Sequence, residues 1–146
     1  MYMVEDILQT KGKAVWSLAP QATMKEALHV LAEKNIGALI VLDEGKVVGI
    51  LSERDIVRQM DKEGHCDLEM PVSKLMTREV ITVGSEKTLD ACMKLMTLKH
   101  IRHLPVVDEG TLVGVISIGD VVRWVIDDQL HKINDLEKFI SGNYSR

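Results

Sequence analysis

The sequence is poor in aromatic residues and cysteine, and each shortage limits what the chain can be. Only 3% of its 146 residues are aromatic, so the core must be built from aliphatic side chains and methionine. The two cysteines, Cys66 and Cys92, belong to no CxxC pair or metal-spaced cluster, and a reduced, cytoplasmic chain is the simpler interpretation. His65 beside Cys66 does not make a metal site by itself, so we expect no metal.

Long hydrophobic runs and basic blocks are also missing. The longest apolar stretch, Ile36 to Leu42, has the length of a strand and is far too short to span a membrane. The first residues lack the basic start and apolar centre of a signal peptide. The net charge is -4 without a block of lysine or arginine, which argues against nucleic acid as a partner. We therefore expect a cytoplasmic protein that contacts neither membrane nor nucleic acid.

An internal repeat with an offset of 65 residues organises the chain. The stretch from Val15 to Arg58 has a second copy without a gap, in which Asp43-Glu44-Gly45 recurs as Asp108-Glu109-Gly110. Roughly a third of the paired positions are identical, which indicates two copies of one structural unit. We divide the chain into residues 1–62 and 63–126 as the repeats and residues 127–146 as a C-terminal helical tail.

Each copy predicts the same order of elements: strand, helix, strand, strand, helix. The expected strands are 15–18, 38–42 and 46–51 in the first copy and 80–83, 104–107 and 111–116 in the second. A capping box of Thr23 and Glu26 starts the first helix, whose apolar residues recur at helical spacing. The paired strands meet at an Asp/Gly turn, which is typical of a hairpin. The fold class is therefore mixed α/β (α+β), with two βαββα repeats.

Two kinds of segment lie outside the repeat. The lead-ins, 4–8 and 72–76, are offset by 68 residues, and we expect each to pack on the opposite copy. Residues 121–140 predict one long helix with an apolar stripe of Val122, Ile126, Leu130, Ile133, Leu136 and Ile140. Packing within the chain and dimer formation both explain that stripe, and we favour a homodimer.

The most informative motif is Gly49-x-x-Ser52-x-x-Asp55, repeated as Gly114-x-x-Ser117-x-x-Asp120. In the simpler interpretation, each Ser caps a helix and each Asp completes a capping box. A nucleotide contact is the alternative, because a helix start attracts phosphate and a carboxylate one turn inside can accept bonds from a ribose diol. Glycine inside an apolar strand also indicates close approach by a ligand or another backbone.

Together, the repeat and these motifs resemble the CBS (cystathionine β-synthase) domain family, in the two-repeat form of small bacterial proteins. The resemblance rests on Ile36–Val41, Ile101–Val106, Ser52–Asp55, Ser117–Asp120 and the tail. It implies a pseudo-twofold pair of repeats, commonly dimeric, with two clefts that bind an adenosine ligand such as AMP, ATP or NAD.

The resemblance also implies the residues of each cleft. The first would hold Ser52, Arg54 and Asp55, with the base near Ile101 and His103. The second would hold Ser117, Gly119 and Asp120, with the base near Ile36 and Ala38 and with Arg102 close to the phosphates. Lys87 is a further candidate for reaching phosphate. From helical spacing, we expect Arg58 and Arg123 to pair with Asp55 and Asp120.

Three functions stay open. We favour a non-catalytic sensor for signal transduction, which binds an adenine nucleotide and regulates an unknown partner protein. An enzyme is a second possibility, with His103 as a base, but no catalytic triad, Walker loop or HExxH motif supports it. The third is a structural or partner-docking dimer with vestigial clefts. The apolar tail favours that alternative, and the aspartate kept in both copies argues against it.

Overall fold

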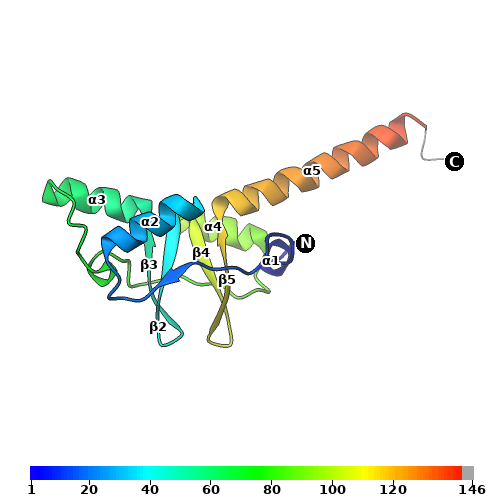
Figure 1. Ribbon diagram of the computed structural model, residues 1–146. Coiled ribbons are helices and arrows are strands. Elements are labelled where there is room, and N and C mark those ends of the chain that lie inside the picture. Colours follow the sequence, from blue (N-terminus) through cyan, green and yellow to red (C-terminus); the bar gives the residue numbers. More distant parts are fainter. Residues whose placement is uncertain (143–146) are drawn as a thin grey trace.

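The computed structural model describes residues 1–142, and the predicted residues 143–146 of the tail lie outside that part. In chain order the elements are α1 Val4–Lys11, β1 Ser17–Leu18, α2 Met24–Lys34, β2 Ala38–Asp43, β3 Lys46–Ser52, α3 Glu53–Glu63, a 3-10 turn Val72–Lys74, α4 Leu89–Lys99, β4 His103–Asp108, β5 Thr111–Ser117 and α5 Ile118–Ile140 (Figure 1). Mixed helices and two small sheets confirm the predicted fold class.

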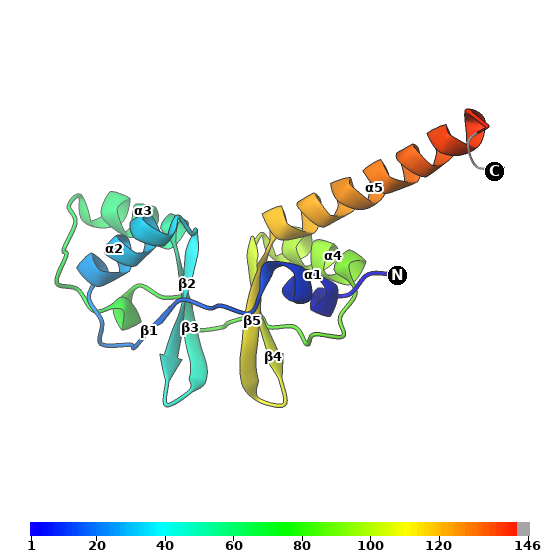
Figure 2. The same cartoon turned by 45° about the vertical axis from the view of Figure 1, so that its right-hand side comes forward.

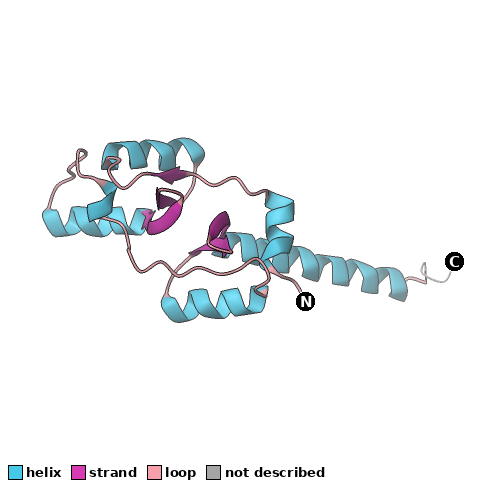
Figure 3. Ribbon diagram, turned by 90° about the horizontal axis from the view of Figure 1, so that it is seen from below, coloured by secondary structure: helices cyan, strands magenta, loops and turns pink. Residues whose placement is uncertain are grey.

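A β-hairpin forms the centre of each repeat. β2 pairs with β3 and β4 pairs with β5, both antiparallel and both with an irregularity after the equivalent residues Val41 and Val106. The turn residues Glu44 and Gly45 both have positive φ, 50° and 79°, as a tight hairpin turn requires. Seen from below, the two hairpins lie side by side with helices around them, and β3 lies next to β5 (Figure 3).

The strands expected before each hairpin are shorter than predicted. β1 contains only Ser17 and Leu18 and pairs parallel with β2. In the second repeat, the strand predicted at 80–83 is reduced to a single bridge between Val83 and Val106. The preceding chain is occupied elsewhere, because Thr77 pairs with Ile50 of the first repeat. This connection therefore crosses between the repeats instead of following β4.

Helices α2 and α4 bury the apolar stripe that the sequence predicts. The side chains of Met24, Ala27 and Leu31 are at most 6% exposed, and the equivalent Leu89, Cys92 and Met96 are equally buried. Thr23 caps α2 by accepting the N–H of Glu26 at 3.2 Å. The return bond that would complete the expected capping box is not among the bonds of residues 1–142.

The lead-in segments exchange partners, as the sequence analysis expected. α1 contributes Val4, Ile7 and Leu8 to the core of the second repeat. In return, Val72 and Met76 complete the core of the first repeat. Each hydrophobic core is therefore closed by the segment that precedes the other copy, which ties the two repeats into one unit.

α5 confirms the predicted long helix and projects away from the body of the molecule (Figures 1 and 2). Its first turn is anchored by Val121, which is fully buried. Beyond it, the apolar stripe is open to solvent, with exposed fractions of 58% at Leu130 and 61% at Leu136. No helix within residues 1–142 combines the length and apolar character needed to cross a membrane.

Candidate functional site

A cavity of about 680 Å³ lies between the two repeats, a volume within the usual range for small-ligand sites. Three segments form it: the start of α3, the end of α4 with the start of β4, and the connection that crosses between the repeats. The lining residues are Gly37, Ile50, Ser52–Asp55, Val57, Arg58, Thr77, Glu79–Ile81, Lys99–His103 and Pro105. We call this cavity the first cleft.

Ser52 and Asp55 form a complete capping box at the start of α3. The Asp55 backbone N–H donates to Ser52 Oγ at 3.2 Å, and the Ser52 N–H donates to Asp55 Oδ2 at 2.9 Å. The Ser52 hydroxyl also donates to Asp55 Oδ2, at 3.1 Å. Within residues 1–142, Asp55 Oδ1 accepts no hydrogen bond, and the residue lines the first cleft. Asp55 thus serves its helix with one oxygen and keeps the other for a ligand.

Ile101 and His103 face these residues from the second repeat, as the sequence analysis expected of the first cleft. The imidazole of His103 lies against Gly37, so closely that a Cβ at position 37 would be 3.3 Å from its Cε1 atom. Burial lowers the pKa of His103, and the nearby Asp120 carboxylate opposes that shift without reversing it. His103 is therefore neutral at pH 7.

Cationic side chains outnumber anionic ones around the first cleft. Arg54, Arg58, Lys99 and Arg102 line it, against Glu53, Asp55 and Glu79. This balance suits a ligand that carries negative charge and also offers hydroxyl donors to a carboxylate. The cleft therefore fits a phosphorylated sugar better than a cation.

Two arginines differ from their predicted places. Arg102 was expected beside the second cleft, but it lines the first, because the segment that leads into β4 faces the start of α3. Arg58 makes no ion pair with Asp55 within residues 1–142 and lines the same cleft, so that expected pair is wrong. The equivalent pair of Arg123 with Asp120 is present, at 3.7 Å.

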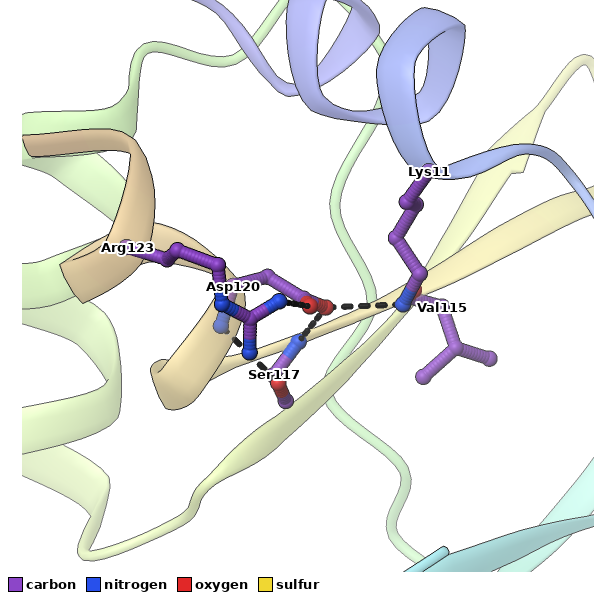
Figure 4. Close-up of polar contacts among 5 residues, drawn as sticks. All are labelled: Lys11, Val115, Ser117, Asp120 and Arg123. Carbon is purple, nitrogen blue, oxygen red and sulfur yellow. Dashed lines mark hydrogen bonds and ion pairs between the residues drawn. The ribbon is translucent and has the colours of Figure 1, made fainter. Parts of the chain in front are cut away.

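The second copy of the motif has the same capping box and a different neighbour (Figure 4). The Ser117 N–H donates to Asp120 Oδ2 at 2.9 Å, and the Asp120 N–H donates to Ser117 Oγ at 3.1 Å. Lys11, at the end of α1, donates from Nζ to Asp120 Oδ2 at 2.7 Å and to the Val115 carbonyl at 2.9 Å. Burial raises the pKa of Asp120, but the bonds from Lys11 and Ser117 outweigh it and hold the pKa below its ordinary value.

Known families account for this architecture. The sequence profile of the CBS domain matches residues 4–62 and 72–127. The chain belongs to the CBS domain family. A crystal structure of a CBS-domain protein from Burkholderia ambifaria is 38% identical, with a TM-score of 0.82, over 87% of this chain and 96% of that one. The stand-alone, small bacterial type expected from the sequence is thereby confirmed.

Two further CBS pairs have been solved with ligands. The pair of protein MJ0100, in complex with 5-methylthioadenosine and S-adenosylmethionine, is 28% identical, with a TM-score of 0.78, over 88% of this chain and 98% of that one. CBSX2, in complex with AMP, is 28% identical, with a TM-score of 0.71, over 88% of this chain and 99% of that one. All three ligands contain adenosine.

The glycines inside the CBS hairpins have a different role from the one expected. They were interpreted as marks of close approach by a ligand or another backbone. Instead, a Cβ at Gly49 would overlap the side chain of Met76, and one at Gly114 would lie 2.7 Å from Leu8 Cδ2. The close approach is made by side chains of the exchanged lead-ins, so these glycines support the fold and give no evidence for a ligand.

The remaining predicted residues surround the second copy of the motif only in part. Ile36 packs against the core of the first repeat, and Ala38 lies opposite Ser52 in the hairpin register. Gly119 is exposed in the first turn of α5. Lys87 lies at the other end of α1 from Lys11, where its carbonyl accepts the N–H of Val4. It is not among the residues that line the first cleft.

Sequence reasoning missed Lys11 and Glu79, although one signal could have found them. The lead-ins are offset by 68 residues, and continuing that offset pairs Lys11 with Glu79. Both residues adjoin the motifs, Lys11 at Asp120 and Glu79 on the first cleft. Within residues 1–142, no group of three or more His, Cys, Asp or Glu residues could hold a metal ion.

Proposed function

We propose that this CBS pair is a non-catalytic, cytoplasmic sensor that binds an adenine nucleotide in the first cleft. The observation that carries the proposal is the partly free carboxylate of Asp55 at one side of a cavity whose other charged residues are mainly cationic. The ligand-bound relatives support the adenosine part, because AMP, 5-methylthioadenosine and S-adenosylmethionine share it.

In this proposal, Asp55 Oδ1 accepts hydrogen bonds from the ribose diol while Oδ2 continues to cap α3. The base lies between the repeats, beside Ile101 and the neutral imidazole of His103. Arg54 and Arg102 pair with the phosphate. The helix start contributes less than the sequence suggested, because the Glu53 N–H already donates to the Gly37 carbonyl at 3.0 Å and the Asp55 N–H to Ser52.

Ligand binding then acts on a partner by linkage. A nucleotide held between segments of both repeats favours the arrangement in which those segments lie close together. Its effect on the affinity for a partner equals the difference in nucleotide affinity between the two arrangements of the repeats. AMP, ATP and NAD all fit this chemistry, and the regulated partner is a separate protein.

Isothermal titration of AMP, ATP and NAD into wild-type protein and Asp55→Ala tests the proposal. We expect saturable binding of at least one nucleotide and a loss of tenfold or more in affinity for Asp55→Ala, about 1.4 kcal/mol. Asp61→Ala, an exposed carboxylate on the same helix, is the matched control and should bind as wild type does. Equal affinity in all three proteins would refute the role of Asp55.

We also propose that the chain is a homodimer joined through α5. Its stripe of exposed aliphatic side chains supports this, since a helix with one apolar face is stable when that face is covered. If Asp55→Ala leaves nucleotide response unchanged while disruption of α5 abolishes assembly, the chain is a structural dimer and not a sensor.

A further inference from the structure

The second copy of the motif offers its aspartate to Lys11 and not to solvent. The Asp120 side chain is only 10% exposed, and Lys11 Nζ and Arg123 lie within 4.0 Å of its two oxygens. Lys11 reaches it from α1, 109 residues earlier in the chain. The ammonium group therefore occupies the acceptor that, on the first copy of the motif, the proposed function assigns to a ribose (Figure 4).

The two copies of the motif differ at matching atoms. In the first repeat, the Ile50 carbonyl accepts the backbone N–H of Thr77 at 2.9 Å. In the second, the carbonyl of the equivalent Val115 accepts Lys11 Nζ, also at 2.9 Å. The residue that corresponds to Lys11 in the first lead-in is Glu79, whose negative charge cannot pair with Asp55. The pair that holds Asp120 therefore has no counterpart beside Asp55.

Displacing Lys11 carries a free-energy cost that a ribose cannot repay. The bond from an ammonium to a half-buried carboxylate is charge-assisted, and it is stronger than a bond from a neutral hydroxyl. Removing Lys11 would also leave the Val115 carbonyl without that donor. The cavity observations agree, because neither the first cleft nor the smaller cavity of about 170 Å³ is lined by Ser117 or Asp120.

We infer that Lys11 acts as a built-in occupant of the second cleft, so that each chain takes one adenine nucleotide, and takes it beside Asp55. This inference rests on the proposed function for its ligand and adds the number and place of the bound molecules. Lys11 is thus a specificity-determining residue: it makes two clefts of related sequence unequal.

The test is the stoichiometry of AMP measured by isothermal titration and by native mass spectrometry on the full chain. Wild type should bind one AMP per chain. Lys11→Met keeps most of the side-chain stem and removes the ammonium, and it should bind two; Lys11→Gln provides a second, polar variant in case Met disturbs the end of α1. Lys13→Met, a change of an exposed lysine two residues away, should still bind one.

A second variant locates each molecule. Asp55→Ala should reduce wild type from one AMP to none, and Lys11→Met with Asp55→Ala should retain one. Two AMP per wild-type chain would overturn the inference and leave the proposed function standing. One AMP on both Lys11 variants would overturn it too, as would two on wild type and one on Lys11→Met, which would make Lys11 a ligand contact. Absence of binding in every form would overturn the proposed function, and the inference with it.

Discussion

Leu8 of α1 packs directly on the bare Cα of Gly114 in β5, with both methyl groups of the leucine turned toward the strand. Met76 makes the same contact with Gly49 in the other repeat. Each pair joins a lead-in to the hairpin of the opposite repeat. The hairpin glycines therefore determine how closely the exchanged segments approach, and through them how the two repeats are held together.

Gly114→Ala should lower the free energy of unfolding by about 1–3 kcal/mol, because the new methyl group overlaps Leu8 in a packed core. Urea denaturation measures this change. Gly119→Ala is the matched control: its Cβ would meet nothing closer than Ser117 Oγ at 3.6 Å, and in a helix alanine is the better residue, so stability should be unchanged or higher. Equal stability of Gly114→Ala and wild type would contradict the packing described.

The pH dependence of stability should show the burial of His103. Its pKa is lowered in the folded protein, so the unfolded chain takes up the proton first as the pH falls below about 6.5. The stabilisation is therefore complete above that pH and is lost below it. Each unit by which the pKa is lowered corresponds to about 1.4 kcal/mol.

The measurement is urea denaturation at pH 7.5 and pH 5.5. Replacing His103 by Gln, which does not titrate, should reduce the difference in unfolding free energy between the two pH values. His29→Gln removes an imidazole that is 74% exposed and should leave that difference as in wild type. A difference that is unaffected by His103→Gln would mean that another group causes the pH dependence.

Arg102 should contribute to AMP binding although the sequence assigned it to the other cleft. Arg102→Gln removes a charge-assisted bond to phosphate, so the Kd for AMP should rise about tenfold, or about 1.4 kcal/mol. Its salt dependence should become weaker, because one charge fewer faces the ligand. Arg123→Gln is the control, since that arginine pairs with Asp120 and does not line the first cleft. Titrations at two salt concentrations would show whether both arginines behave alike, which would contradict this assignment.

The assembly state should depend on the apolar stripe of α5. Leu130→Glu places a charge in the middle of that stripe, where burial in a dimer would cost the desolvation of a carboxylate. Sedimentation velocity should show a dimer for wild type and a monomer for this variant. Gln129→Glu adds the same charge at the neighbouring polar position and should remain dimeric. A monomeric wild type would remove the role proposed for α5.

The sequence by itself determined the elements whose causes are local. The Ser52 and Asp55 capping box, the Glu44-Gly45 turn and the helical stripe of Met24, Ala27 and Leu31 follow from residues within a few positions of each other, and a 65-residue repeat states each of them twice. The exchanged lead-ins were also within reach, because their different offset separates them from the repeat.

Only the tertiary structure decided what lies against those elements. The pairing of Lys11 with Asp120, the contact of Leu8 with Gly114 and the cleft on which Arg102 lies each join residues of different segments. Such contacts depend on how the repeats pack, and no periodicity along the chain records that packing. Two motifs that look alike in sequence therefore differ in their partners, since a side chain 109 residues away reaches one aspartate and not the other.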